Sequence, residues 1–478
     1  MDKFFLTTPI YYVNARPHIG HVYTNIAADV LARYYRAKGR EVLFSTGTDE
    51  NSQKNVEAAE KAGKDVQGYV DEMAEEWKRI FTDLGFSFDT FIRTTAPEHV
   101  QAVQAFIERI DKAGDMYVGD YEGLYCVGCE TFLKEDELVD GKCPIHKTVP
   151  QKITEKNYFF ALSKYRQKLL DHFKDNPEFL QPSSARNKML HYIEHEMEDV
   201  SISRQSQKWG IRLPQNDDHA VYVWFDALIN YLTVTGFPDK KFEKFWPADL
   251  HLIGKDIIKF HCAIWPAMLL SAGLPLPKRV FAHGFFTVDG QKISKSLGNA
   301  IDPMTLAKEY PFDVIRYYVL RDIPFGNDGD FSHERLKERY NADLANGLGN
   351  LVSRTLNMIQ QFGGDTFDAD GAQLPAEVDA TLSSVSAYIE SLAFDKALES
   401  IWQAIAWADG LIEETKPWQL AKAGDTARVT GILQELYATL VAVNMHLAPF
   451  LPQTHEKLSA ILSARPILKP PTPLFLRK

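Results

Sequence analysis

The chain has 478 residues, of which 45% are hydrophobic and 24% charged, and its formal net charge is −11. That length favours several domains over one core, and the acidic balance gives no support to nucleic-acid binding unless the protein carries a locally basic surface. The 4 cysteines are too few for a disulfide framework and indicate a reducing compartment. We expect a cytoplasmic protein, because no apolar run is long enough to span a bilayer and strand-like sequence stands where a signal peptide would begin.

Residues 1–115 alternate strand-like and helical patterns. The strand-like stretches "KFFLTTP" and "EVLFSTGTDE" are followed by one helical pattern that starts at His18 and another that covers "NVEAAEKAGKDVQGYVDEMAEEWKRIF". Such an alternation is typical of a parallel α/β sheet with right-handed crossovers. The sequence therefore predicts an α/β domain whose first half is residues 1–115.

Residues 116–220 interrupt this pattern. They contain short strand-like stretches, turns and three of the four cysteines, so we interpret them as an insert. The α/β pattern returns over 221–300 with "AVYVWFDALINYL" and "DLHLIGKDIIKFHCAIWPAML", and we expect 301–340 to be a linker or stem-contact region. Residues 341–478 hold long amphipathic segments such as "LANGLGNLVSRTLNMIQQF", which predict a C-terminal α-helical bundle.

Two histidines lie where the first strand and its loop lead into a helix, in "PIYYVNARPHIGH". His18 and His21 fall on one face of the first helical turn. Backbone N–H groups and the helix dipole favour phosphate at such a position, and imidazole nitrogens add directed donors. The alternatives are a metal site and a pair of buried, hydrogen-bonded histidines.

Two pairs of metal-binding residue types lie in the insert. Cys126 and Cys129 form one pair, Cys143 and His146 form the other, and two residues separate the members of each pair. Three thiolates and one imidazole match a closed tetrahedral zinc site, which leaves no coordination position for a substrate. The sequence thus predicts one structural zinc ion per chain, against the alternative of chance cysteine placement.

A Gly-bounded loop, "DGQKISKSLGN", follows a strand-like stretch in the second half of the α/β domain. It carries Lys292, Ser294, Lys295 and Ser296. Lysine supplies a mobile positive charge for oxygens that become more negative during phosphoryl chemistry. A loop of this composition is usually solvated surface, and its combination with the two histidines is what favours phosphate chemistry.

These two motifs resemble the HIGH and KMSKS signatures of class I aminoacyl-tRNA synthetases. They read HIGH at residues 18–21 and KISKS at residues 292–296, with isoleucine in place of methionine as the one departure. The resemblance to methionyl-tRNA synthetases extends over essentially the whole chain. It implies a Rossmann-like catalytic domain with a parallel sheet, split by a zinc-knuckle insert and followed by a C-terminal α-helical bundle that binds the anticodon.

The resemblance also implies a pocket for L-methionine. Asp49, in "STGTDEN", would bind the substrate ammonium. A flexible, polarizable thioether packs well against aromatic edges, and a hydrogen-bonding group from Tyr12 or His261 near the sulfur would help to reject aliphatic side chains. Each aromatic residue taken alone is better explained by core packing. The residues that the resemblance assigns to the pocket are Ile10, Tyr12, Asp49, Trp224, Ala227, Leu228, Tyr231, Ile257, His261 and Trp265.

ATP, carried with Mg²⁺, is the second substrate that the resemblance implies. The two histidines together with Lys292 and Lys295 would act on its phosphates while methionyl-adenylate forms. Gly254 allows close backbone approach, and the Asp256 carboxylate accepts hydrogen bonds from ribose hydroxyls. The ATP-binding residues assigned in this way are His18, Gly20, His21, Gly254, Asp256, His283, Phe286 and Lys295.

The third substrate is tRNA(Met). Asn350 and Arg354 lie about one turn apart on the same helix face, and Trp418 follows Pro417. By resemblance, the tryptophan would stack on an anticodon base while the other two side chains hydrogen-bond base edges; for Trp418 packing against a helix is the alternative. No further tRNA-binding segment follows residue 478, so we expect a monomer.

Three rival functions are weighed against this one. A cysteine-type class I synthetase would carry zinc in its amino-acid pocket, which this knuckle does not resemble. A nucleotidyltransferase of the H-x-G-H type would lack the long C-terminal helical domain. A zinc-knuckle RNA-binding protein would have no catalytic activity.

Overall fold

The computed structural model describes residues 2–478 apart from 129–130, 134, 293–300, 364–366 and 469–471. The chain divides into two units: unit 1 comprises Met1–Ala28 and Lys38–His283, and unit 2 comprises Asp29–Ala37 and Gly284–Lys478. Among the residues described, no helix has both the length and the apolar character that crossing a membrane requires. The five-part division expected from the sequence stays a prediction.

Unit 1 is built on a six-stranded sheet in which all neighbouring strands are parallel. In spatial order the strands are β3 (Thr90–Arg93), β2 (Glu41–Asp49), β1 (Lys3–Tyr12), β12 (Leu250–Gly254), β13 (Val280–His283) and β7 (Leu180–Gln181). From the middle of the sheet, β1, β2 and β3 follow one another toward one edge, and β12 and β13 follow one another toward the other edge. The strand order therefore reverses between β1 and β12, which is where parallel sheets of this kind bind ligands. The predicted Rossmann-like α/β core is confirmed.

The central strands are buried along most of their length, because helices cover both faces of a parallel sheet. One position admits only glycine. A Cβ on Gly47 of β2 would lie 2.1 Å from the carbonyl oxygen of Ile92 on β3, so a larger residue would push the two strands apart. The absence of a side chain at Gly47 thus lets β3 pair closely with β2 just before β2 reaches its end.

The helical pattern after β2 forms two helices instead of the single run that the sequence suggested. Helix α2 ends at Lys61, and Gly63 then adopts a left-handed conformation with φ +65°. The Asp65 side chain accepts a hydrogen bond from the backbone N–H of Gly68 at 2.8 Å and so caps the next helix. The helices of unit 1 are α1 (Ile19–Ala37, shared with unit 2), α2 (Gln53–Lys61), α3 (Val66–Asp83), α4 (Pro97–Lys112), α5 (Arg166–Asp175), α6 (Ser183–His195), α7 (Val223–Ala227), α8 (Asn230–Thr233) and α9 (Trp265–Ser271).

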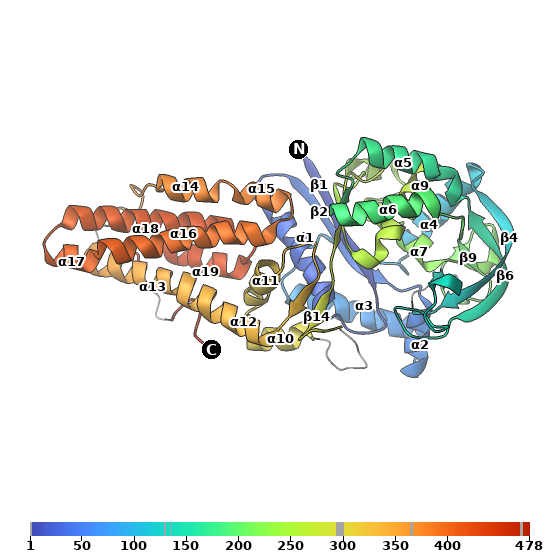
Figure 1. The fold of residues 1–478 in the computed structure, drawn as a ribbon, viewed down its shortest axis with the longest axis horizontal. Helices are drawn as coiled ribbons and strands as arrows, with labels where there is room; N and C mark the ends of the chain where they lie inside the picture. Colours follow the sequence, from blue (N-terminus) through green and yellow to red (C-terminus); the bar gives the residue numbers. More distant parts are fainter. Residues whose placement is uncertain (1, 129–130, 134, 293–300, 364–366, 469–471) are drawn as a thin grey trace. The chain divides into compact units, whose positions relative to one another are not determined.

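The insert contributes two antiparallel sheets to unit 1. In the first, β4 and β6 pair over almost their whole length and form the long curved ribbon seen in Figure 1. Its strands are β5 (Thr131–Leu133), β4 (Met116–Cys126), β6 (Gln151–Phe160) and β8 (Val200–Ser201). Those of the second are β10 (Arg212–Leu213), β11 (Asn216–Val221) and β9 (Ser203–Arg204).

Unit 2 is mostly helical. Four of its helices, α13, α16, α18 and α19, pack side by side, as Figure 1 shows, and confirm the predicted C-terminal bundle. The helices of unit 2 are α10 (Pro303–Glu309), α11 (Phe312–Arg321), α12 (His333–Arg339), α13 (Gly349–Met358), α14 (Ala376–Leu382), α15 (Val385–Glu390), α16 (Phe394–Thr415), α17 (Pro417–Lys422), α18 (Thr426–Leu447) and α19 (Pro452–Ser463), and the strands are β14 (Phe286–Val288), β15 (Gln291–Lys292) and β16 (Gly329–Phe331). Wider π-helical turns, Tyr340–Leu348 and Ile359–Gly363, flank α13.

A buried arginine joins three parts of unit 2. Arg316 of α11 donates to the Asp29 carboxylate of α1 at 2.6 Å and to the carbonyl oxygens of Pro449 and Phe450 at 2.8 and 2.7 Å. Both charged side chains are almost fully buried. The ion pair and the two carbonyl acceptors together satisfy most of the guanidinium's donors, which is the condition for burying such a group.

Candidate active site

The carboxyl ends of four strands of unit 1 carry residues that the sequence singled out. β1 ends at Tyr12, β2 at Asp49, β12 at Gly254 and β13 at His283. Because the strands are parallel, these ends meet at one edge of the sheet, at the point where the strand order reverses. The candidate site lies at this edge.

The first helix begins at Ile19, so His18 directly precedes it and His21 lies in its first turn. The centroids of the two imidazole rings are 3.8 Å apart, and the ring planes are tilted by 31°. The backbone N–H of His18 donates to Nδ1 of His21, and the N–H of Gly20 donates to Nδ1 of His18, both at 3.1 Å. Each Nδ1 is therefore an acceptor, and the neutral rings carry their protons on Nε2. This arrangement provides two N–H donors at a helix N-terminus, as phosphate binding requires.

Aromatic side chains hold His21 in place. Tyr11 and Trp77 each lie with their ring centroids 5.0 Å from that of His21, and Tyr11 and Trp77 also stack on each other at 5.3 Å. The indole N–H of Trp77 donates to the carbonyl oxygen of Ala15 at 2.8 Å, within the loop that leads to His18. Sequence reasoning missed both residues, since Trp77 reads there as one buried position of an amphipathic helix.

The other predicted ATP residues are distributed over both units. Buried His283 shares a hydrogen bond of 2.7 Å with the Thr24 hydroxyl of α1, while half-buried Gly254 and exposed Asp256 follow β12. In unit 2, Phe286 starts β14, and Lys292 ends β15. Lys295 lies outside the described residues.

A pocket opens at the same edge of the sheet. It is lined by Pro9, Ile10, Asp49, Trp224, Ala227, Leu228, Asn230, Tyr231 and His261. Seven of these had been assigned to the methionine pocket by resemblance; Pro9 and Asn230 had not. Asn230 is almost fully buried, and its side chain donates to the carbonyl oxygen of Ala227 at 2.6 Å. Neither residue type carried a recognisable signal in the sequence.

Three predicted pocket residues are not among those that line it. Tyr12 lies edge-on to Trp224, with ring centroids 6.5 Å apart. Trp265 is fully buried behind Tyr231, with ring centroids 6.1 Å apart. Ile257 contributes its carbonyl oxygen, which accepts a hydrogen bond from His261. Each of the three thus contacts a residue that lines the pocket.

Two buried groups in the pocket have fixed donor and acceptor roles. Nδ1 of His261 lies 3.0 Å from the carbonyl oxygen of Ile257, which can only accept, so Nδ1 carries the proton. Burial lowers the pKa of His261 to about 4, so the ring is neutral near pH 7 and Nε2 is unprotonated. The Tyr231 hydroxyl, 2.7 Å away, must therefore donate to Nε2. Both ring nitrogens of His261 thus already have a hydrogen-bond partner within the protein, and a contact of Tyr12 or His261 with a thioether stays a prediction.

Three of the four predicted zinc ligands are described, and they lie together. The sulfur atoms of Cys126 and Cys143 and a ring nitrogen of His146 are within 4.8 Å of one another. The backbone N–H of His146 also points at the Cys143 sulfur, 3.4 Å away. A Cβ on Gly128 would lie 2.4 Å from the His146 ring, so only glycine allows this approach. Cys129 lies outside the described residues.

The predicted anticodon residues all belong to unit 2. Asn350 is exposed on α13, and Arg354, one turn later, donates to Glu413 of α16 at 2.7 Å and lies 3.7 Å from Asp409. Trp418 is half-buried in the first turn of α17. Lys416 makes the turn between α16 and α17 in a left-handed conformation, with φ 47°.

The family model for tRNA synthetases class I (M) matches residues 4–154 and 136–356. This match, the parallel sheet and the paired histidines at the first helix define a class I aminoacyl-tRNA synthetase.

Comparisons with individual proteins show which family within this class the chain resembles. The chain is 48% identical to the methionine–tRNA ligase of Thermotoga maritima, over 95% of this chain and 74% of that protein, and 44% identical to that of Thermosynechococcus vestitus, over 95% and 88%. It superposes on Mycobacterium tuberculosis methionyl-tRNA synthetase in complex with methionyl-adenylate with a TM-score of 0.94 at 40% identity, covering 100% of both chains. The apo form of that enzyme gives a TM-score of 0.86 at 38% identity, covering 100% of this chain and 98% of the other. The chain belongs to the methionine–tRNA ligase family.

The pH dependence of stability tests the neutral state of His261. Its pKa in the folded protein, about 4, lies below the ordinary 6.5, so the unfolded chain binds more protons and the free energy of unfolding falls as the pH drops through this range. From about pH 7.5 to about pH 5 this group should remove about 2 kcal/mol. The free energy of unfolding of the wild type and of His261→Gln is measured by urea denaturation across this pH range. The loss caused by His261 should be present in the wild type and absent from the variant. Equal slopes would contradict the assignment.

Proposed function

We propose that this protein ligates L-methionine to tRNA(Met) through a methionyl-adenylate, with release of pyrophosphate and then AMP. The observation that carries the proposal is the juxtaposition, at one sheet edge, of an apolar pocket that contains one carboxylate and a helix N-terminus with two imidazole N–H donors. The pocket suits an aliphatic amino acid with a cationic group, and the helix N-terminus suits a polyphosphate. The family membership of the chain and its likeness to a structure with bound methionyl-adenylate support it.

In the pocket, Asp49 would pair with the substrate ammonium. Ile10, Ala227 and Leu228 offer apolar surface, and Trp224 and Tyr231 offer aromatic surface against which a thioether packs well. Because the Tyr231 proton is donated to His261, the phenol oxygen is oriented and the hydroxyl cannot turn freely toward a wrong substrate.

The first step needs no general base, because the methionine carboxylate is already ionised at neutral pH. One carboxylate oxygen attacks the α-phosphorus of ATP, the bond from that phosphorus to the bridging oxygen breaks, and pyrophosphate leaves with the bonding electrons. The Nε2–H groups of His18 and His21 would donate to phosphate oxygens as negative charge develops. We assign Lys292 and Lys295 to the same phosphates. Bound together with ATP, Mg²⁺ would supply positive charge to the phosphate oxygens.

The second step uses the adenylate as an acyl donor. A ribose hydroxyl at the 3′ end of tRNA attacks the activated carbonyl carbon, the ester to tRNA forms, and AMP leaves. We assign Asn350, Arg354 and Trp418 to the anticodon. In unit 2, the ion pair with Glu413 directs the Arg354 side chain along the surface between α13 and α16. A location in the cytoplasm and a monomeric state stay predictions.

The Cys/His cluster would hold one zinc ion per chain. Two buried thiols and one imidazole within 4.8 Å of one another fit the donor set of a structural site, to which the sequence adds Cys129. With four protein ligands the ion would brace the turns at the end of β4 and take no part in the reaction.

ATP–pyrophosphate exchange tests the proposed function. The wild type should exchange labelled pyrophosphate into ATP when methionine is added, and not with cysteine or without an amino acid. His21→Ala should lower the exchange rate by on the order of a hundredfold, since one preorganised donor to the phosphates is lost. Its affinity for methionine, measured by equilibrium dialysis, should stay close to that of the wild type. An unchanged exchange rate would sink the role of His21, and exchange that does not depend on methionine would sink the function.

Elemental analysis tests the metal site. The purified wild type should contain about one zinc ion per chain, and Cys143→Ser should lose most of it, because a site with four ligands binds far more weakly with three. Cys262→Ser is the matched control, since Cys262 lies apart from the cluster and should leave the zinc content unchanged. Zinc-free wild-type protein with an intact fold would contradict the site.

The anticodon assignment predicts separate effects on the two half-reactions. Trp418→Ala should leave methionine-dependent exchange near the wild-type rate, because that reaction involves no tRNA. Charging of tRNA(Met) should fall by roughly ten- to a hundredfold, the loss expected for one base-stacking contact, and discrimination against a tRNA with one changed anticodon base should weaken. Trp418→Phe, which keeps an aromatic face, should retain most of the charging activity. If exchange, charging and melting temperature all fell together in Trp418→Ala, the residue would have a packing role.

A further inference from the structure

Directly after Asp49 lies a carboxylate that no part of the proposed mechanism uses. The Glu50 side chain is fully buried, and Arg93 at the end of β3 donates to both of its oxygens, from Nε at 2.8 Å and from Nη2 at 2.9 Å. The Thr48 hydroxyl donates to one of these oxygens at 2.7 Å, and the Thr95 hydroxyl donates to the other. Four hydrogen bonds therefore fix the position of this carboxylate.

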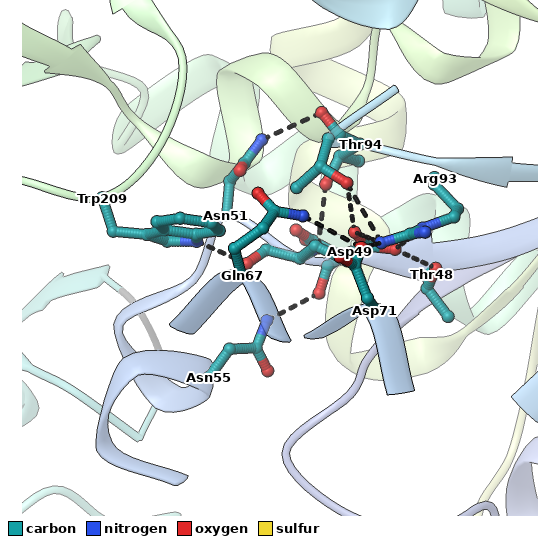
Figure 2. A network of polar contacts seen from close by, with 11 residues as sticks. Thr48, Asp49, Asn51, Asn55, Gln67, Asp71, Arg93, Thr94 and Trp209 are labelled. Carbon is teal, nitrogen blue, oxygen red and sulfur yellow. Dashed lines mark hydrogen bonds and ion pairs between the residues drawn. The ribbon is translucent and has the colours of Figure 1, made fainter. Parts of the chain in front are cut away.

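The backbone around Glu50 is held as firmly as its side chain. The N–H of Glu50 donates to the Thr94 hydroxyl at 2.8 Å, and its carbonyl oxygen accepts from the indole N–H of Trp209 at 2.9 Å. The carbonyl oxygen of Asp49 accepts from the Asn55 side chain, also at 2.9 Å. Figure 2 shows Asn55, Thr94 and Trp209 on different sides of this segment. Side chains from three separate parts of the chain thus anchor two consecutive peptide groups.

The next residue connects the segment to the opposite wall of the pocket. The Asn51 side chain donates to the buried Asp226 carboxylate of α7 at 2.9 Å, and its carbonyl oxygen accepts from Gln207 at 3.0 Å. Asp226 also lies 3.2 Å from the ring of His99. Helix α7 carries Trp224 and Ala227, which line the pocket. Residues 49–51 therefore link the part of the pocket that contains Asp49 to the part that α7 forms with Trp224 and Ala227.

Charge balance explains why an ion pair suits this place. A second carboxylate next to Asp49 would attract the substrate ammonium to the wrong group if it were left unpaired. The Arg93 guanidinium, which also pairs with Asp71, neutralises it, and the hydrogen bonds that Arg93 donates to Glu50 are the main reason that the pKa of Arg93 is raised. Buried ion pairs contribute little net stability compared with apolar packing, so a role in geometry accounts better for this one.

We propose that Glu50 and Arg93 are positioning residues for methionine binding: their ion pair sets the place of the Asp49 carboxylate and leaves that group as the single negative charge facing the substrate ammonium. The inference rests on the proposed function, because it concerns the ammonium contact of the same pocket. Replacement of Glu50 by glutamine would loosen the bidentate contact and remove one of the two carboxylates that pair with Arg93, so that Asp71 alone would balance its charge and the site would become more positive near the ammonium. Both effects weaken binding of a cation at Asp49 and leave the apolar part of the pocket unaffected.

Two competitive inhibitors separate the ammonium contact from the rest of the pocket. L-Methioninol keeps the ammonium and the thioether, whereas 4-(methylthio)butanoate keeps the thioether and lacks the ammonium. Inhibition constants are measured in the exchange assay for the wild type and for Glu50→Gln. The variant should bind methioninol more weakly by on the order of tenfold, as expected for a charged hydrogen bond that is weakened, and should bind 4-(methylthio)butanoate as the wild type does. The KM for methionine should rise together with the inhibition constant of methioninol, while the KM for ATP stays unchanged.

Three further variants make the outcome decisive. Thr95→Val removes one hydrogen bond to Glu50 and keeps both charges, so it should show a smaller loss of the same kind, and it serves in place of Glu50→Gln if that variant does not fold. Arg93→Lys keeps the positive charge but loses the bidentate geometry. Its loss of affinity for methioninol should lie between the losses in Thr95→Val and in Glu50→Gln. Glu72→Gln is the matched control, because its exposed side chain pairs with Lys64 on the surface of unit 1 and should change neither constant.

The proposal and the proposed function fail in different ways. If both inhibitors lost affinity equally, or neither did, Glu50 would act only in folding and the positioning role would be wrong. If the wild type showed no methionine-dependent exchange while still binding methioninol, the proposed function would be wrong and the ammonium contact could still be measured by direct binding of the two compounds.

Discussion

The parallel pairing of β1 with β12 is the contact on which the rest of unit 1 depends. It joins Leu6 to Leu250 and Thr7 to His251, residues that are more than 240 positions apart in the chain. Because β2 and β3 extend the sheet on one side and β13 on the other, the strand order reverses at this pair, and the loops that follow the strands diverge. The pocket and the helix that begins at Ile19 both lie at that divergence. The pairing of β1 with β12 does not need a short connection between the two strands, so the chain can accommodate an insert between the two halves of the sheet.

Preorganisation is the common property of the polar groups at this edge. Backbone N–H groups decide the tautomer of His18 and His21, and a backbone carbonyl decides that of His261. In each case hydrogen bonds within the protein fix which ring nitrogen donates and which accepts, before any substrate binds. Fixed donors need no reorganisation when charge develops on phosphate, which is the main route by which a site without a general base lowers a barrier.

The charge at each site is decided by local pairing of side chains and not by the acidic balance of the whole chain. Near the pocket, Arg93 neutralises Glu50, and Asn51 and His99 satisfy Asp226, so that Asp49 faces the pocket as the carboxylate that lines it. In unit 2, Arg354 is shared between Asp409 and Glu413. The formal charge of −11 therefore says little about the sites, because the charge that a ligand meets depends on which side chains lie beside it.

The sequence by itself determined the fold class, the paired histidines and the ligand types of the knuckle, because strand and helix periodicity and the spacing within a motif are local properties. It also indicated seven of the residues that line the pocket through resemblance. It could not reveal Asn230, whose place in the pocket depends on how α8 packs, or Trp77, which reads as an ordinary core position. It could not assign the donor and the acceptor nitrogen of His261, since these roles follow from Ile257 and Tyr231 together. Only the tertiary structure brings Arg93 to Glu50 and Asp226 to Asn51, because such contacts form between segments far apart in the chain, where no local pattern records them.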